Sequence, residues 1–428
     1  MRLNFDKIFD ELYPINRSII GAGYQKSLKI LSKYLKFKIF KFKSGKKIYD
    51  WTIPKEWVVK NAFLKNIKTS KIICSYKKNN LSIINYSIGV NKKLKFKSFR
   101  NKIYTLKSLP NAIPYVTSYY KRDWGFCIKY NELKKINNND QFHLFIDSKF
   151  KDGNIELGVN LLKGKTNKII LITSYLCHPS MANNELSGPL TMLGLYEKLK
   201  QKKNKYSYMF LINPETIGSI CFLKKYHKFL KKNLVSGLVL TCTGGPKKTL
   251  SYKLSKDGQG PLDKLYLNLA KHNICKIRKF DASEGSDERQ FCSPGFNFNI
   301  GQISRTVYGT YKEYHTSADN KNFMKISQIK KSINEIYKNL ELFEKLEPIS
   351  RKMPFCELQL GKRGLYPNKN FRSFTNKSKK EMFTRNLLNI LSYADGKNNL
   401  LDIANRLNLP ITNLETAYDL LKEKKLII

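Results

Sequence analysis

The sequence predicts an α/β protein in which a mixed, mostly parallel sheet is flanked by helices, with an inserted β-rich module and a C-terminal winged-helix domain. First, apolar runs alternate with amphipathic stretches over residues 141–350, as in sheets whose two faces are both covered by helices. Second, residues 42–140 carry short alternating runs such as LSIINYSIG, which are typical of half-buried strands. Third, three short amphipathic stretches over residues 376–428 favour a small winged-helix unit.

In chain order, helices are predicted over 3–13 and 23–36, separated by the loop PINRSIIGAG. Strands follow at FHLFIDSKF, IELGVNLLKG, KIILITSYL, YSYMFLINP and SGLVLTCTG, and helices at 190–200, 219–230, 262–272 and 326–346. The last three helices are predicted at FTRNLLNILSYAD, LLDIANRLN and NLETAYDLLKEKKLI. We therefore expect a discontinuous domain, an insert, a linker and a winged helix, at residues 1–41 with 141–350, 42–140, 351–375 and 376–428.

The chain is strongly basic, with 79 Lys and Arg against 33 Asp and Glu and a formal charge of +46 at pH 7. Only 12 of the basic residues are Arg, and the lysines are spread over every segment, whereas readers of bases and phosphates favour clustered Arg. The last predicted helix also carries Glu415, Asp419 and Glu423, which would face phosphates unfavourably. We expect solvated lysine faces, no specific nucleic-acid binding, and a packing or protein-interaction role for the C-terminal domain, rather than a DNA-binding regulator.

The eight cysteines are scattered, often inside apolar runs, and no CxxC pair occurs. A thiolate zinc site of the usual spacing is therefore not expected, and free buried thiols favour a reducing cytoplasm. The first twenty residues read as an amphipathic helix and not as a signal peptide, because Asp and Glu interrupt their apolar positions. No apolar run approaches the roughly 18 residues of a membrane span.

Polar and ionisable residues follow the predicted strands, where open α/β sheets place their ligands. His178 follows IILITSYL, Glu215 follows the next strand, and Asp287 and His315 lie in later polar loops. Two histidines with carboxylates suit a divalent ion of borderline hardness, and Glu215 would then be the base that activates a water molecule.

Each of these residues also has a purely structural reading. His178 precedes a proline and fits a turn, whereas Glu215 and Thr216 fit the start of a helix. Asp287 fits a surface pair with Arg289, and His315 fits a hydrogen-bonded structural side chain. The order of the four residues on successive strand ends favours the metal site.

A family resemblance rests on motifs that span nearly the full chain. From about residue 141 to 346 the sequence resembles the zinc aminopeptidase fold of the M28 peptidases, and as a whole it resembles the bacterial DUF4910 aminopeptidase-like proteins. Those proteins carry a β-rich DUF2172 insert and often a winged helix, and they are associated with surface-polysaccharide biosynthesis. The motifs are LYPINRSIIG, WTIPKEW, IPYVTSYYKRDWGFC, CHPSMANNELSGP, PETIGS, GSDERQFCSPG, YHTSADN and CELQLGKRGLYP.

The resemblance implies roles for these residues. His178 and His315 match the two metal histidines, Glu215 matches the general base, and Asp287 matches an aspartate beside the metal site. Three expected acidic ligands are replaced, by Asn184, Thr216 and Thr241. Glu185 lies one place after the bridging position, so the carboxylate is expected to have moved along the turn. The resemblance therefore implies one zinc ion, held by His178, His315 and a carboxylate from Glu185 or Asp287.

The stretch SYYKRDWGFC is expected to line the same cleft, with Arg122 and Tyr120 binding substrate. Arg122 would clamp a carboxylate or phosphate through two hydrogen bonds, although its aromatic neighbours equally fit the core of the β-module. Arg17 and Arg363 are weaker candidates of the same kind.

The function expected from these features is a metal-dependent hydrolase of the aminopeptidase-like class. Its substrate would carry an amide or peptide-like bond and be a small or sugar-linked molecule. The alternative is a non-catalytic binding protein with a degenerate metal site, favoured by Asn184, Thr216 and Thr241.

Overall fold

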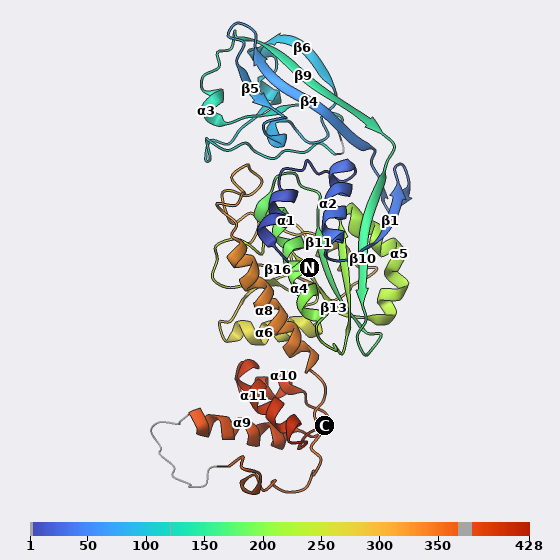
Figure 1. Cartoon of the computed structure of the whole chain (residues 1–428), viewed down its shortest axis with the longest axis vertical. Coiled ribbons are helices and arrows are strands. Elements are labelled where there is room, and N and C mark those ends of the chain that lie inside the picture. Colours follow the sequence, from blue (N-terminus) through green and yellow to red (C-terminus); the bar gives the residue numbers. More distant parts are fainter. Residues whose placement is uncertain (1–2, 120, 367–378) are drawn as a thin grey trace.

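We describe the structure from a computed structural model of the chain, which covers residues 3–119, 121–366 and 379–428. A four-stranded sheet lies at one end of the long axis, an eight-stranded sheet with its helices in the middle, and three helices at the other end (Figure 1). In this part of the chain, each helix is too short or too polar to cross a membrane.

The central sheet is mixed, with the strand order β1-β10-β12-β11-β13-β16-β14-β15. Its core pairs, β11 with β12, β11 with β13 and β13 with β16, are parallel, whereas β1–β10, β10–β12 and β14–β16 are antiparallel. The strands are β1 (Lys38–Lys43), β10 (Asn154–Leu162), β11 (Ile169–Tyr175), β12 (Ser207–Asn213), β13 (Leu234–Leu240), β14 (Ser251–Lys253), β15 (Lys276–Arg278) and β16 (Ile300–Ser304).

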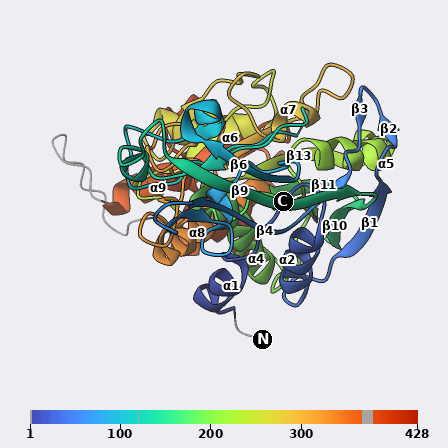
Figure 2. The same cartoon turned by 90° about the horizontal axis from the view of Figure 1, so that it is seen from above.

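Helices cover both faces of this sheet, and β11, in which every residue is buried, shows why. Ile170 and Ile172 pack with α1, α2, α4, α6 and α8, whereas Ile169 and Leu171 pack with α5 and α7. Seen from above, α1, α2 and α4 lie on one side of β10 and β11, with α5 on the other (Figure 2). The helices are α1 (Phe5–Leu12), α2 (Ala22–Ser32), α4 (Ser187–Leu199), α5 (Ile217–Asn233), α6 (Pro261–Lys271), α7 (Glu288–Phe291) and α8 (Ile326–Glu344).

The second sheet has the order β5-β4-β9-β6, and all its pairs are antiparallel. Its strands are β4 (Glu56–Asn66), β5 (Ile72–Ser75), β6 (Val90–Lys95) and β9 (Gln141–Lys151). The same region holds the short pairs β2 (Lys47–Ile48) with β3 (Trp51–Thr52) and β7 (Ile103–Tyr104) with β8 (Phe126–Cys127), and the helix α3 (Tyr130–Leu133). Long loops connect these strands. One of them, residues 112–117, reaches the central domain, where Pro114 pairs with Thr316.

The C-terminal helices α9 (Lys379–Tyr393), α10 (Leu400–Arg406) and α11 (Thr412–Glu423) pack against the central domain. The side chain of Asn268 on α6 donates to Asn405 at 2.8 Å and accepts from the Ile411 amide at 2.9 Å. Lys345, directly after α8, pairs with Glu415 at 2.9 Å and Asp419 at 2.8 Å on α11. Two of the three acidic residues of α11, Glu415 and Asp419, are therefore paired with the central domain, whereas Glu423 lies beside Lys424.

The fold class predicted from the sequence is confirmed: a mixed α/β sheet flanked by helices, a β-rich region and a C-terminal winged helix. The helices and strands predicted in the central domain lie within a few residues of their observed bounds. The strands β1, β14, β15 and β16, the short helix α7 and a π-helical turn at Ala182–Leu186 were not predicted. The stretch FHLFIDSKF, expected as the first strand of the central domain, forms β9 of the second sheet.

Candidate functional site

Two adjacent parallel strands bring the first functional residues together. The chain leaves β11 at Tyr175 and reaches His178 three residues later, and it leaves β12 at Asn213 and reaches Glu215 two residues later. Because the carboxyl ends of parallel neighbours meet at one edge, these side chains converge. His178 Nε2 lies 3.7 Å from Glu215 Oε2.

His178 is held from behind by a buried carboxylate. Its Nδ1 atom lies 2.7 Å from Glu185 Oε2, and the Glu185 side chain is fully buried. Glu185 comes from the π-helical turn between β11 and α4, a backbone form that often occurs at functional sites. A carboxylate on Nδ1 fixes the ring orientation and leaves Nε2 directed toward Glu215.

Arg17 closes the inner side of this pair. Its guanidinium is fully buried, donates to the His178 carbonyl at 2.9 Å, and lies 4.0 Å from Glu185 Oε1. Arg17 thus connects the loop before α2 to the loop that carries His178, and we interpret its role as structural.

Glu215 stands at a strained turn. Thr216 has φ 64° and ψ −76°, and the Ile217 amide donates to the Glu215 carbonyl at 2.8 Å, which closes a three-residue γ-turn. Such a conformation is costly for a β-branched residue and is found mainly where function requires it. The turn is held by Asp287, which accepts from the Thr216 amide at 2.7 Å and from the Asn213 side chain at 2.9 Å.

The Glu215 carboxylate is oriented by a hydroxyl. Ser286 Oγ donates to Glu215 Oε1 at 2.6 Å, which leaves Oε2 toward His178. The Glu215 side chain remains 26% exposed, so it is the acidic group of the site that reaches solvent.

His315 completes the site from a loop far along the chain. Its ring centroid lies 5.4 Å from that of His178, and its Nε2 atom lies 3.1 Å from Asn184 Oδ1. Since the Asn184 amide group donates to Tyr175, its oxygen faces His315, and His315 Nε2 is the donor in this pair. An amide therefore occupies the place where the resemblance implied a bridging carboxylate.

The inserted region forms one wall of the site. The ring of Tyr115 lies 5.4 Å from that of His178 and 5.2 Å from that of His315. The Tyr115 amide donates to the His315 carbonyl at 2.8 Å, and the Ser317 amide donates to Ile113 at 2.8 Å. The two loops thus run together as a short β-bridge, and the insert fixes the backbone that carries His315.

Burial governs the protonation of the site. It raises the pKa of Glu215, although His178 and the Ser286 hydrogen bond lower it, and together with the Glu215 charge it raises the pKa of Asp287 to about 7. Burial, aided by His178, lowers the pKa of His315 to about 3, so this ring is neutral at physiological pH.

His178 behaves in the opposite way. Burial alone would lower its pKa, but Cys177, Tyr115 and Glu185 together raise it well above the usual range. We attribute the net increase to Glu185, because burial raises the pKa of the Cys177 thiol to about 11 and this group is uncharged at neutral pH. The imidazole ring is thus placed between two carboxylates, Glu185 and Glu215.

The structure brings together most of the residues singled out from the sequence, namely His178, Glu185, Glu215, Asp287 and His315. Arg122 lies apart from them, stacked on Phe150 beside a separate cavity, and Arg363 donates to the Gln359 carbonyl. Tyr120 lies outside the described residues. The hydroxyls of Thr241 and Tyr175 share a hydrogen bond of 2.5 Å, so Thr241 is part of the buried side of the site.

Sequence reasoning missed three residues of the site, Tyr115, Ser286 and Asp319. Fully buried Asp319 accepts from the amides of Asn183 and Asn184 at 2.6 and 2.9 Å and holds the π-helical turn. Asp319 and Ser286 lie within quoted motifs, YHTSADN and GSDERQFCSPG, so the signal was present. Cys177, His178 and Glu185 also form a buried cluster whose candidate ligand atoms lie within 4.8 Å of one another.

The side chains around His178 include donor atoms that suit a divalent ion. His178 offers Nε2 with its other nitrogen bound to a carboxylate, as in many metal sites, and the neutral His315 ring lies 5.4 Å from the His178 ring, centroid to centroid. At Asn184, Thr216 and Thr241, where the resemblance implied carboxylates, this chain has an amide and two hydroxyls.

Comparison with known proteins agrees with this architecture. A Clostridium acetobutylicum protein, named as a candidate polysaccharide biosynthesis protein with an aminopeptidase-like domain, is 37% identical over 98% of this chain and 95% of its own length. The crystal structure of a candidate peptidase from the same organism superposes with a TM-score of 0.89 at 36% identity, covering 99% of this chain and 95% of the other.

More distant solved structures share the fold. A zinc aminopeptidase from Bacillus subtilis has a TM-score of 0.55 at 12% identity, covering 79% of this chain and 95% of the other. The M28 peptidase precursor from Shewanella amazonensis gives a TM-score of 0.55 at 11% identity, with 79% and 91% covered.

Two family models divide the chain between them. The family described as a domain of unknown function, DUF4910, matches residues 6–346, and a winged helix-turn-helix family matches residues 347–428. With its M28-type aminopeptidase fold and its C-terminal winged helix, this chain belongs to the DUF4910 family.

Proposed function

We propose that the protein is a metal-dependent hydrolase of an amide or peptide-like bond, with one zinc ion and a sugar-linked or peptide-like substrate. The observation that carries this proposal is the grouping of His178, Glu215 and His315 at one sheet edge, with His178 held by Glu185. The name of the relative supports a place in polysaccharide biosynthesis.

The metal would be held by His178 Nε2 and His315, with Glu185 and Asp287 as supporting carboxylates. When bound, zinc supplies Lewis-acid polarisation of a substrate carbonyl. Asp287 contacts the turn and not the histidines, and Glu185 contacts Nδ1 of His178, so both act in this proposal by positioning.

Glu215 is the proposed base. It is the acidic group of the site that solvent reaches, and its raised pKa makes it a better proton acceptor near neutral pH than an ordinary carboxylate. The Ser286 hydrogen bond fixes one oxygen, so the other receives a proton from the attacking water at a defined place.

A binding protein without catalysis is the second candidate. It is favoured by the neutral groups in ligand positions. Asn184 already accepts a hydrogen bond from His315, and Thr241 shares one with Tyr175. In that case the site would bind its ligand without hydrolysis.

Metal content and turnover, measured together, separate the two candidates. We expect about one zinc per chain in the wild type and its loss in His178→Ala, but not in His143→Ala, which changes a histidine on β9. Glu215→Gln should keep the metal, and its rate of hydrolysis of aminoacyl or N-acyl amino-sugar amides should fall by a factor of about 10²–10⁴. Equal metal content in the wild type and His178→Ala, or no turnover of any of these amides, would contradict the hydrolase and favour the binding protein.

A further inference from the structure

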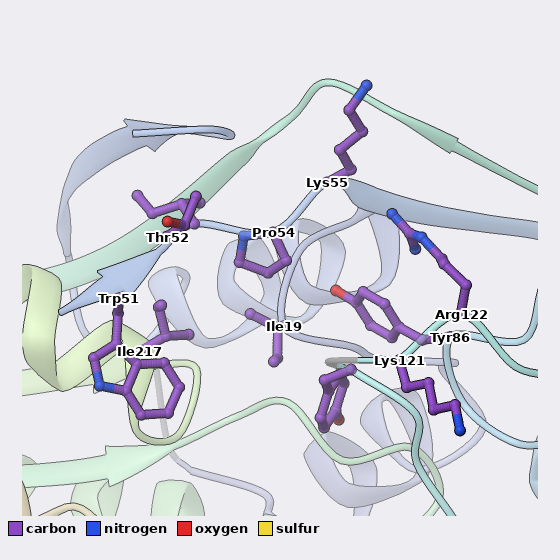
Figure 3. A pocket seen from close by; sticks show the side chains of 11 residues that line it. Ile19, Trp51, Thr52, Pro54, Lys55, Tyr86, Lys121, Arg122 and Ile217 are labelled. Carbon is purple, nitrogen blue, oxygen red and sulfur yellow. The ribbon is translucent and has the colours of Figure 1, made fainter. Parts of the chain in front are cut away.

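A cavity lies beside the site, between the inserted region and the start of α5. It encloses about 260 Å³ and is lined in part by Ile19, Trp51, Tyr86, Arg122 and Ile217. Trp51 and Ile217 lie on one side, Tyr86, Lys121 and Arg122 on the other, and Ile19 between them (Figure 3). Its volume is below the about 300–1,000 Å³ of drug-sized ligands, so it suits a group of one ring.

Aromatic side chains form much of the wall. Tyr86 is buried, and its ring lies 4.8 Å from that of Tyr119, which also lines the cavity. The Tyr86 hydroxyl lies beside Ser18 and Ile20 but makes no hydrogen bond of good geometry with a described residue. Tyr86 is only 1% exposed and its ring stacks on Trp57, so the half-buried Trp51 is the side chain that offers an apolar face to a ligand.

The rim is basic. Arg122 stacks flat on Phe150, with its guanidinium carbon 3.5 Å from the ring centroid, which leaves the N–H edge for an acceptor. The acidic residues nearby pair elsewhere: Asp123 with Lys102, and Glu56 with Lys151. Lys121 and Arg122 thus give the opening a net positive charge that a carboxylate or phosphate matches.

The cavity adjoins the candidate catalytic residues. Ile217 in its wall follows Glu215 by two positions across the γ-turn. On the other side, Tyr119 bonds through its hydroxyl to that of Tyr115 at 2.9 Å, and Tyr115 contacts both histidines. A ligand in the cavity would therefore lie next to the site and not at a remote surface.

We propose that this cavity binds a monosaccharide ring that carries one anionic group, with the ring packed on Trp51 and the anion on Arg122 and Lys121. A sugar ring presents C–H faces that pack on an aromatic ring, and its hydroxyls suit a polar rim. That this sugar is the substrate rests on the proposed function; that the cavity binds it does not.

Calorimetry on the full chain tests the proposal. The probes are glucuronate, glucose 1-phosphate, neutral glucose, inorganic phosphate and uridine monophosphate, titrated into Glu215→Gln protein so that no probe is turned over. We expect the two charged sugars, or one of them, to bind more tightly than glucose and phosphate, and the stronger of the two identifies the anion. Arg122→Gln should weaken that binding about 10- to 100-fold.

Arg100→Gln, which changes an exposed arginine elsewhere in the inserted region, serves as the control and should bind like the parent. Equal weakening in both arginine variants, phosphate binding as tight as the sugars, or tightest binding of the nucleotide would overturn the proposal. Binding that depends on Arg122 in a protein without hydrolytic activity would instead contradict only the proposed function.

Discussion

At the scale of single residues, Glu185 is the buried carboxylate that would hold His178 in the proposed metal site. Its Oε2 atom forms a hydrogen bond of 2.7 Å with His178 Nδ1. We expect Glu185→Gln to weaken zinc binding about 10- to 100-fold, the usual effect of losing such a partner, and excess zinc to restore part of the activity. Metal titration of the variant beside Glu197→Gln, a partly exposed change on α4, would measure this. Unchanged zinc affinity would exclude this supporting role.

Asp319 predicts a pH dependence of stability. Burial raises its pKa to about 6, although three backbone amides of the π-helical turn lower it. The folded state therefore holds a proton that the unfolded chain releases above about pH 4, and stability falls as pH rises from about 4 to 6. Asp319→Asn should flatten this slope, by about 3 kcal/mol over the window, while Asp50→Asn on the surface should not. Denaturant unfolding at several pH values provides the measurement, and parallel slopes in all three proteins would contradict it.

Among the elements, the γ-turn before α5 carries a backbone cost that can be removed. Thr216 has φ 64°, a region that glycine occupies without strain. We expect Thr216→Gly to raise the free energy of unfolding by about 1 kcal/mol, whereas Thr216→Ala, which keeps the β-carbon, should give no such gain. If both variants show the same stability, the turn is not strained. Loss of activity in Thr216→Gly would show that the turn also holds Glu215.

The same element shows what sequence could and could not predict. The buried runs of β11 and β12 are readable, and so are His178 and Glu215 behind them. The γ-turn is not, because threonine gives no signal for positive φ. Tyr115 lies in the motif IPYVTSYYKRDWGFC, but its role could not be predicted, since its contact with His315 spans 200 positions and depends on how the insert folds back. Glu185 was readable as acidic but not as the partner of Nδ1, which the π-helical turn decides.

For the whole molecule, the charge distribution predicts weak and unspecific contact with DNA. Glu415 and Asp419 both pair with Lys345, so this acidic face of α11 already has a partner in the central domain, although Asp419 remains exposed. We expect deletion of residues 376–428 to leave filter retention of a duplex nearly unchanged, with the same steep loss as salt increases. A sequence-specific footprint that disappears on deletion would contradict this prediction and favour a regulator.

The β-bridge between the insert and the His315 loop also has a consequence for the order of folding. His178 and His315 lie 137 positions apart, and the backbone of His315 is fixed by Tyr115, which lies 200 positions before it. Contacts over such separations close late, because the entropy of large loops opposes them until local structure has formed. We therefore expect the site to assemble late in folding, only after the insert has docked on the central domain.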